Sequence, residues 1–356
     1  MSRDVRVVAR SKLTLSLRVL GRRPDGFHDL EALVVSLRDP HDVIGLRIQA
    51  PFGVRVRLSG RAVVGVPVDE TNLAARAARL LLEVAAEGDD PGPWAASGLD
   101  ISLHKSIPAG AGLGGGSADA AGTLVGGTRL LGLGLDTARL AALGAALGSD
   151  VPFCVAGGAA WMRGRGEILE PLSLPAWATP PTAPGLSQLS PSPAGPGPGP
   201  FGTVTVPAPP PGPSMGTSWP AAPEQAGVPL VVAVPQFPLT TAAVYRAWDE
   251  LGGPSSERAV SLPEGLAGLG LPGELINDLE PAAEHLEPRL RPFREALEAL
   301  AGAPALLAGS GSAYVVPVAS PAQAAVLANQ VSVELRATAF ATGLTARGVE
   351  AQKSPD

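Results

Sequence analysis

The residues in this sequence best suited to binding a ligand are the glycines that precede Ser117. The stretch from Lys105 to Ser117 reads Lys-Ser-Ile-Pro-Ala-Gly-Ala-Gly-Leu-Gly-Gly-Gly-Ser, with five glycines between Gly110 and Gly116. Glycine lets backbone N–H groups approach a ligand closely, and a helix N-terminus adds unpaired donors and the positive end of a dipole. Together they predict an anion site suited to phosphate. A plain tight turn is the alternative, although it needs only one or two glycines. The spacing is not that of a Walker A loop, which requires a Lys after the last glycine.

The elements that must position this loop are a strand before it and a helix after it. Residues 99–104 favour a strand, and helices are expected over 117–131 and 137–147. The apolar pattern also predicts a helix over 72–86 and strands over 6–9, 13–19, 34–37, 43–48 and 54–58. Further along, strands are expected over 230–234, 305–307 and 314–318, and helices over 240–251, 292–301 and 322–337. The pattern is therefore a mixture of α and β.

Proline divides the chain in two. Nearly half of the 38 prolines lie between Pro171 and Pro229, in a stretch with almost no charge and no apolar period. Because proline removes backbone donors, no packed element is expected there. An inert, disordered insertion is the main interpretation, and a ligand for a proline-binding partner is the alternative. The predicted organisation is an N-terminal domain (1–170), an insertion (171–229), a C-terminal domain (230–347) and a tail (348–356).

Charge and composition exclude several classes of protein. The net charge is −6, so there is no basic surface for nucleic acid. Cys154 is the single cysteine, which excludes a disulfide framework and fits a reducing cytoplasm. No apolar run is long enough to predict a membrane span. Only three basic residues are lysines (Lys12, Lys105 and Lys353), which indicates that lysine is kept where the planar fork of arginine would not serve.

Six motifs, taken in order, resemble those of one enzyme family. The glycine stretch continues as Pro108-x-x-x-Gly-Leu-Gly-Gly-Gly-Ser-x-Asp-Ala-Ala, which is similar to the phosphate loop of the GHMP small-molecule kinases. The other motifs resemble the 4-diphosphocytidyl-2-C-methyl-D-erythritol kinase family within that superfamily. They are Gly21-Arg-Arg-Pro-Asp-Gly-Phe-His-Asp-Leu30, Gly148-Ser-Asp-Val-Pro-Phe153 with the glycines up to Gly164-Arg-Gly-Glu167, Thr240-Thr241 before Tyr245, Asn277-Asp-Leu-Glu-Pro281 and Gly309-Ser-Gly-Ser312.

The resemblance implies a fold, a reaction and a catalytic pair. The implied fold is α+β, with a ribosomal-protein-S5-like N-terminal domain and a ferredoxin-like C-terminal domain. The implied reaction uses ATP and Mg²⁺ to phosphorylate the 2-hydroxyl of the methylerythritol unit in non-mevalonate isoprenoid biosynthesis. Asp150 matches the family's catalytic base, and Lys12 matches the lysine that stabilises developing negative charge. A helix-end aspartate and a surface lysine are the ordinary alternatives. The phosphate loop comprises Pro108, Ala109, Gly110, Ala111, Gly112, Leu113, Gly114, Gly115, Gly116 and Ser117, and Ser117 either caps the helix or binds a phosphate-bound metal.

The same resemblance assigns residues to the substrate. The cytidine is expected against Phe27 and His28, since an aromatic face stacks on a pyrimidine; loop aromatics are more often simply packed. Lys105 is expected to meet a phosphate. The remaining substrate residues are Thr14, Thr240, Thr241, Gly309, Ser310 and Gly311. Thr14 stands where the family usually has Asn, which changes one substrate contact. Asp119 either approaches Mg²⁺ or serves as a first-turn helix charge, and residues 277–280 either act in the site or cap a turn.

Two alternatives to this function stay open. One is another GHMP kinase, acting on homoserine, mevalonate or a sugar, although such enzymes need no cytidine pocket. The other is a catalytically inactive relative that only binds nucleotide. A small-molecule substrate in the cytoplasm is expected, with no nucleic acid and no membrane as partner. The sequence leaves open whether the protein is a monomer or a homodimer.

Overall fold

The computed structural model describes residues 4–49, 53–87, 98–172, 228–261 and 273–352. The predicted Pro-rich insertion therefore lies outside the described residues except at its ends. Those ends belong to β6 (Ile168–Leu172) and to the segment that enters β7 (Pro229–Val234). Within the described part of the chain, no helix is both long and apolar enough to cross a membrane.

The sheet is built on one long strand, β2 (His28–Gln49). One edge of β2 pairs with β1 (Asp4–Arg22) along most of its length. The other edge receives three strands in succession: β5 (Ala159–Gly164) along 30–35, β12 (Thr338–Thr345) at 36–37, and β4 (Gly98–Lys105) along 43–49. Outer strands extend the sheet: β3 (Val54–Gly60) on β4, β6 on β5, and β7, β11 (Tyr314–Pro317) and β10 (Leu306–Leu307) beyond β12. An eleventh strand lies on the outer edge of β1. The sheet therefore runs without a break from the N-terminal half into the C-terminal half.

The last strand corrects one expectation. Residues 348–356 were expected to be a tail, but β13 (Val349–Gln352) pairs antiparallel with β1 over residues 6–9. Val349 and Ala351 pack against the core that the N-terminal sheet forms with its helices. The short strand escapes recognition in the sequence because its partner lies more than 300 residues earlier.

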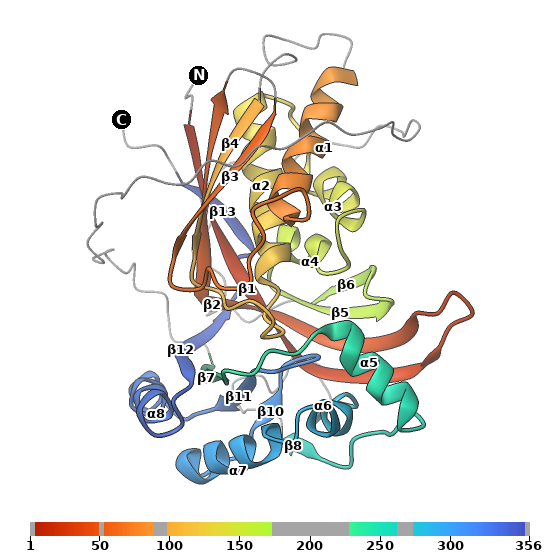
Figure 1. Cartoon of the computed structure of the whole chain (residues 1–356), viewed down its shortest axis with the longest axis vertical. Helices are drawn as coiled ribbons and strands as arrows, with labels where there is room; N and C mark the ends of the chain where they lie inside the picture. The colour runs from red at the N-terminus through yellow and green to blue at the C-terminus, as the bar shows by residue number, and fades with distance from the viewer. Residues whose placement is uncertain (1–3, 50–52, 88–97, 173–227, 262–272, 353–356) are drawn as a thin grey trace.

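Four helices cover one face of the upper sheet: α1 (Leu73–Glu87), α2 (Gly115–Leu131), α3 (Thr137–Ala145) and α4 (Val151–Ala156) (Figure 1). Glycines bring α2 very close to the sheet. A Cβ at Gly126 would lie 2.6 Å from Leu46 Cδ1 and 2.7 Å from a Val7 methyl group. A Cβ at Gly127 would likewise meet Leu81 of α1 at 2.5 Å. Close packing of this kind holds the N-terminus of α2, and so the glycine loop, in one place.

The buried face of α1 is rotated from the predicted one. Ala77 and Leu81 are buried as expected, while Leu73, Leu80 and Val84 are only partly buried and alanines take their place. Small side chains allow α1 to approach α2, which explains the rotation. The core of the lower half joins α5 (Thr241–Glu250), α6 (Glu280–Leu286), α7 (Leu290–Ala301) and α8 (Pro321–Glu334) to the sheet (Figure 1). A separate hairpin pairs β8 (Ala259–Ser261) with β9 (Glu274–Ile276).

Candidate active site

The glycine loop connects β4 to α2, as predicted, but the helix begins earlier than expected. Its first residue is Gly115, and Gly114 precedes it in the left-handed conformation with φ 69°. Ser117 is therefore inside the first turn and is not the N-cap, and its hydroxyl has no hydrogen-bond partner among the described residues. Gly110 and Gly112 also have positive φ, which explains the alternation of glycine with other residues. The loop thus presents the N–H groups of a helix start, which have no acceptor within the helix.

Lys12 and Asp150 meet beside this loop. Lys12 Nζ lies 3.5 Å from Asp150 Oδ2 and donates to Thr14 Oγ1 at 3.1 Å. Lys12 and Thr14 point to the same face of the sheet because they are two residues apart on β1. A register shift between Arg10 and Lys12 marks a β-bulge just before them. Asp150 occupies the N-cap position of α4 but makes no capping hydrogen bond. Its carboxylate faces the lysine instead, with 31% of the side chain exposed.

A second glycine loop closes over the lysine. A Cβ on Gly309 would lie 3.3 Å from Thr14 Oγ1, a tight contact, and 3.7 Å from Lys12 Nζ, an ordinary one, so the loop comes close to both side chains. Gly309 and Gly311 have positive φ. Ser310 Oγ lies 3.0 Å from Thr241 Oγ1, the first residue of α5. Thr240 caps α5 by accepting from the N–H of Ala243, so the two threonines have separate roles.

Lys105 lies in a different setting from the one expected. Its ammonium is buried and ion-paired with both Asp42 and Asp119. Asp42 also accepts the N–H groups of Ser106 and Ile107, at 2.6 and 3.0 Å. Burial alone would lower the pKa of Lys105, but the two carboxylates outweigh it and raise that pKa. The lysine therefore joins the strand side of the glycine loop to α2 through two ion pairs, and it also borders the cavity beside the loop. Its expected contact with a phosphate stays a prediction.

Burial also changes the pKa of Asp119. Desolvation raises its pKa to about 8, opposed by Lys105 and reinforced by Asp42. Asp119 is the fifth residue of α2, beyond the first-turn position considered above. Its Oδ1 has no hydrogen-bond partner among the described residues, and Asp119 borders a cavity of about 200 Å³ beside the glycine loop. The other lining residues include Val66, Pro67, Asn72, Ile107, Gly115 and Gly116.

Phe27 and His28 lie at the far end of the long β1–β2 pair. The Phe27 ring is 54% exposed, with the Arg165 guanidinium 4.7 Å from its centre. His28 stacks on Tyr245, with ring centres 4.9 Å apart, and its Nε2 lies 2.8 Å from Asp249 Oδ1. Tyr245 and Asp249 are four residues apart on α5, so one helix face holds the histidine from two sides.

Comparison with known proteins decides the family. The chain is 36% identical, over 86% of its length and 87% of the relative's, to the 4-diphosphocytidyl-2-C-methyl-D-erythritol kinase of Moorella thermoacetica. The chain belongs to this kinase family. Residues 72–158 also match the family described as GHMP kinases N terminal domain. The enzyme of the same name from Methylococcus capsulatus is 47% identical, over 49% of this chain and 55% of the relative.

Solved structures agree on the fold. A crystal structure of 4-(cytidine 5'-diphospho)-2C-methyl-D-erythritol kinase matches with a TM-score of 0.62 and 30% identity, over 95% of this chain and 98% of that one. Homoserine kinase from Cytophaga hutchinsonii has the same TM-score of 0.62 at 17% identity, covering 99% of this chain and 98% of that one. This second likeness concerns the fold alone. The α+β GHMP kinase fold expected from the motifs is thereby confirmed.

Several residues that shape the site in this family member had no sequence signal strong enough to find them. Asp42 stands 63 residues before Lys105, and only the β2–β4 pairing brings them together. Tyr245 belongs to the Thr240-Thr241 motif but was not assigned to the site, and its four-residue spacing from Asp249 on a predicted helix was a usable but unspecific sign. Among the described residues, no three or more acidic, His or Cys side chains are grouped to hold a metal.

Proposed function

We propose that this protein transfers the γ-phosphoryl group of ATP to the 2-hydroxyl of 4-diphosphocytidyl-2-C-methyl-D-erythritol. The observation that carries the proposal is the Lys12–Asp150 pair, which lies between the glycine loop and the Gly309 loop. An anion site, a carboxylate and an ammonium are the parts that phosphoryl transfer to an alcohol requires. The family membership supports this acceptor.

Asp150 acts as the base. Its carboxylate is partly exposed and has no capping duty, so it can accept the proton of the acceptor hydroxyl. The alkoxide oxygen then bonds to the γ-phosphorus as the bond to the β–γ bridging oxygen breaks, and ADP leaves. Lys12 has three N–H donors. One of them donates to Thr14 Oγ1, Asp150 is an ion-pair partner at 3.5 Å, and the ammonium can stabilise the charge that develops on the transferring group.

The glycine loop and its cavity are proposed to hold ATP. The N–H groups at the start of α2 face the phosphates, and the cavity bordered by Val66, Pro67 and Ile107 takes the base. The residues fit Mg²⁺ bound mainly through nucleotide phosphates, because magnesium commonly takes few protein ligands in such sites. Ser117, with its hydroxyl free in the first turn, would hold it. When bound, Mg²⁺ neutralises phosphate charge.

The cytidine is proposed to lie between Phe27 and the His28–Tyr245 pair. If neutral His28 donates its Nε2 proton to Asp249, its Nδ1 carries a lone pair and is an acceptor. The exocyclic amine of cytosine is a donor at C4, whereas uracil has an acceptor there. The Asp249 contact therefore favours cytosine over uracil.

The experiment compares two aspartates that each precede a helix, of which only Asp136 forms a capping hydrogen bond. Asp150 and Asp136 are the N-cap residues of α4 and α3, and Asn is as good an N-cap as Asp. Asp150→Asn should lower kcat about 10²–10⁴-fold, while Asp136→Asn should leave it near the wild-type value. ADP release is followed with ATP, Mg²⁺ and the CDP-linked alcohol. Near-normal turnover by Asp150→Asn would remove the base from the proposal.

The acceptor is tested in the same assay. ADP release with homoserine or mevalonate, and none with the CDP-linked alcohol, would show that the protein is a different GHMP kinase. Nucleotide binding without transfer to any of the three acceptors would show that it is an inactive relative.

A further inference from the structure

Two neighbouring polar residues between β9 and α6 contact two different segments near Lys12: the Gly309 loop and the strand β1 that carries the lysine. Asn277 is 1% exposed and Asp278 is 4% exposed. Buried polar groups must form hydrogen bonds to offset their lost hydration. The partners of these two residues come from segments far away in the chain, so neither residue serves only its own turn.

Asn277 holds the Gly309 loop. Its Nδ2 donates to the carbonyls of Leu307 and Gly309, at 2.8 and 2.7 Å, and its Oδ1 accepts from the N–H of Leu279 at 3.0 Å. Both amide protons are thus used on one loop. The loop they hold is the one that approaches Lys12 Nζ and Thr14 Oγ1 through Gly309.

The same loop also touches the phosphate loop. A Cβ on Gly112 would lie 2.4 Å from the carbonyl oxygen of Ala308 and 3.1 Å from that of Gly311. The N–H of Ala313 donates to the carbonyl of Ala111 at 3.3 Å. A shift of residues 308–311 would therefore change the contacts of both Lys12 and the glycine loop.

Asp278 holds the strand that carries the lysine. Its N–H donates to the carbonyl of Leu17 at 2.9 Å, and its Oδ2 accepts from the N–H of Val19 at 3.0 Å. Its Oδ1 accepts from the N–H of Ser256 at 2.9 Å. Leu17 and Val19 lie on β1, a few residues beyond Lys12 and Thr14.

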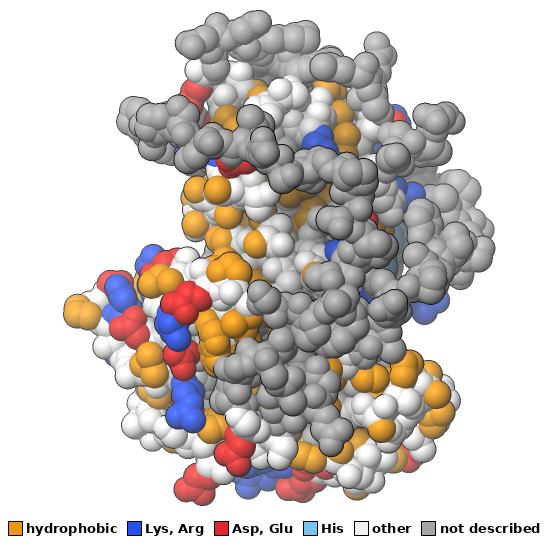
Figure 2. Space-filling model, turned by 180° about the vertical axis from the view of Figure 1, so that it is seen from behind, with side chains coloured by type: hydrophobic (Ala, Val, Ile, Leu, Met, Phe, Trp, Pro, Cys, Tyr) orange, Lys and Arg blue, Asp and Glu red, His pale blue; other side chains and the backbone are white. Residues whose placement is uncertain are grey.

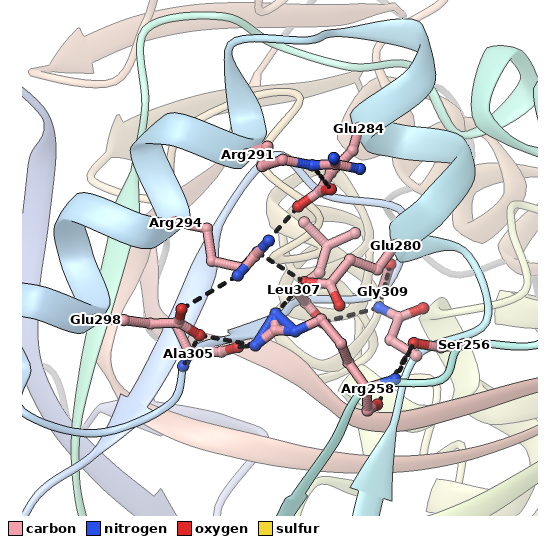
Figure 3. A network of polar contacts seen from close by, with 11 residues as sticks. Ser256, Arg258, Glu280, Glu284, Arg291, Arg294, Glu298, Ala305, Leu307 and Gly309 are labelled. Carbon is pink, nitrogen blue, oxygen red and sulfur yellow. Dashed lines mark hydrogen bonds and ion pairs between the residues drawn. The ribbon is translucent and has the colours of Figure 1, made fainter.

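A network of charged side chains holds Ala305, which precedes the Gly309 loop in the chain. Arg258 bridges Glu280 and Glu298 and donates to the carbonyl of Ala305, while Glu298 accepts from the N–H of Ala305 (Figure 3). Arg294 joins Glu298 to Glu284 (Figure 3). Ala305 is therefore held by two side chains just before the segment that Asn277 holds.

We propose that Asn277 and Asp278 are positioning residues for phosphoryl transfer. Asn277 fixes the position of the Gly309 loop and Asp278 fixes the position of β1. Together they determine the distance between the loop and Lys12. The proposal rests on the proposed function for its kinetic effect. The predicted effect of the two residues on backbone ordering is independent of the proposed function and is measured separately.

The experiment uses two truncations of buried side chains in the same half of the protein. Asn277→Ala removes both loop contacts. Val331→Ala is the control, because Val331 is fully buried on α8, which packs on β7 and β12. Asn277→Ala should lower kcat at least tenfold with KM values within threefold of wild type. Val331→Ala should lower the free energy of unfolding but leave kcat within threefold.

Amide hydrogen exchange separates the two residues. Asn277→Ala should speed exchange in 306–312, whereas the isosteric Asp278→Asn should speed it near Leu17 and Val19 and also lower kcat. If Asn277→Ala fails to fold, Asn277→Ser is used with the same expectations. The proposal is overturned if kcat stays within threefold, if only KM changes, or if Val331→Ala loses as much turnover. Wild-type protein inactive on the CDP-linked alcohol would instead overturn the proposed function, and exchange would still test the contacts.

Discussion

Replacing Lys105 by Met distinguishes a structural lysine from one that binds phosphate. The side chain is 2% exposed, and its partners Asp42 and Asp119 are 0% and 2% exposed. Removing one partner of a buried ion pair leaves an uncompensated charge, which costs about 3–5 kcal/mol. Lys105→Met, which keeps most of the volume, should therefore lower the free energy of unfolding by about that amount.

The pH dependence of this loss has a definite sign. Lys105 is the group that lowers the pKa of Asp119, so the variant should have an Asp119 pKa above the value of about 8 in the wild type. A folded pKa above the unfolded value means that the native state binds the extra proton, so stability falls as pH rises through that window. At pH values above the wild-type pKa and below the higher pKa of the variant, only the variant still loses stability as pH rises. The deficit should therefore be larger at pH 9 than at pH 7.

The measurement is urea unfolding of both proteins at pH 7 and pH 9. The midpoint should shift without a change in slope, which reports stability rather than a change in the denatured state. Arg47→Met is the control, because its pair with Asp4 is on the surface, with the two side chains 65% and 54% exposed, and such pairs contribute at most about 1 kcal/mol. Unchanged stability of Lys105→Met together with a raised KM for ATP would refute the structural role.

Three further predictions test other parts of the structure. Burial raises the pKa of Glu280 to about 7 despite Arg258 and Arg294, so stability should fall as pH rises from about 4.5 to 7; Glu280→Gln should remove up to about 3 kcal/mol of this dependence in urea unfolding at pH 5 and pH 8. Asp249→Asn should reduce the preference for a cytidine over a uridine acceptor about tenfold in kcat/KM, because one hydrogen bond is worth about 1 kcal/mol or slightly more. Gly126→Val should lower the free energy of unfolding by about 1–3 kcal/mol, because its Cβ would overlap Leu46 and force α2 off the sheet.

The surface shows why the pattern of charge in the sequence excluded little beyond nucleic acid. Acidic and basic side chains are interspersed on the face opposite to that of Figure 1, with no large basic area among the described residues (Figure 2). Many charged side chains of the described residues pair with one another, as Arg163 does with Glu31 and Glu170. The net charge of −6 is a sum over the whole chain and does not locate the charges that form the site. Those few charges are placed by the fold.

The glycine loop is the part of the site that the sequence predicted best. Closely spaced glycines between a strand and a helix are a local signal, and the structure has the strand, the loop and the helix in that order. The helix start was predicted two residues late, because Gly114 enters the helix without a side-chain cap. A glycine can do so through its backbone conformation, whereas the prediction assumed that a serine was needed.

The C-terminal half was harder to predict because its parts act across long distances in the chain. Asn277 was left between a role in the site and a turn cap, and the structure shows contacts of both kinds. It accepts from Leu279 within its own turn and donates to the Gly309 loop. The second contact spans about 30 residues, and no local pattern encodes it.

The sequence by itself determined the family, the order of the elements and the residue types available for chemistry, because motifs and apolar periods are local properties. The tertiary structure alone decided which polar groups are free and which are already paired. Lys12 and Lys105 are both buried lysines near the glycine loop, yet Lys12 pairs with one partly exposed carboxylate, whereas Lys105 pairs with two buried ones. The difference arises because the pairing of β2 with β4 brings Asp42 next to Lys105, whereas the Gly309 loop packs next to Lys12. In a low-dielectric interior, the nearest opposite charge determines what a buried ion can do.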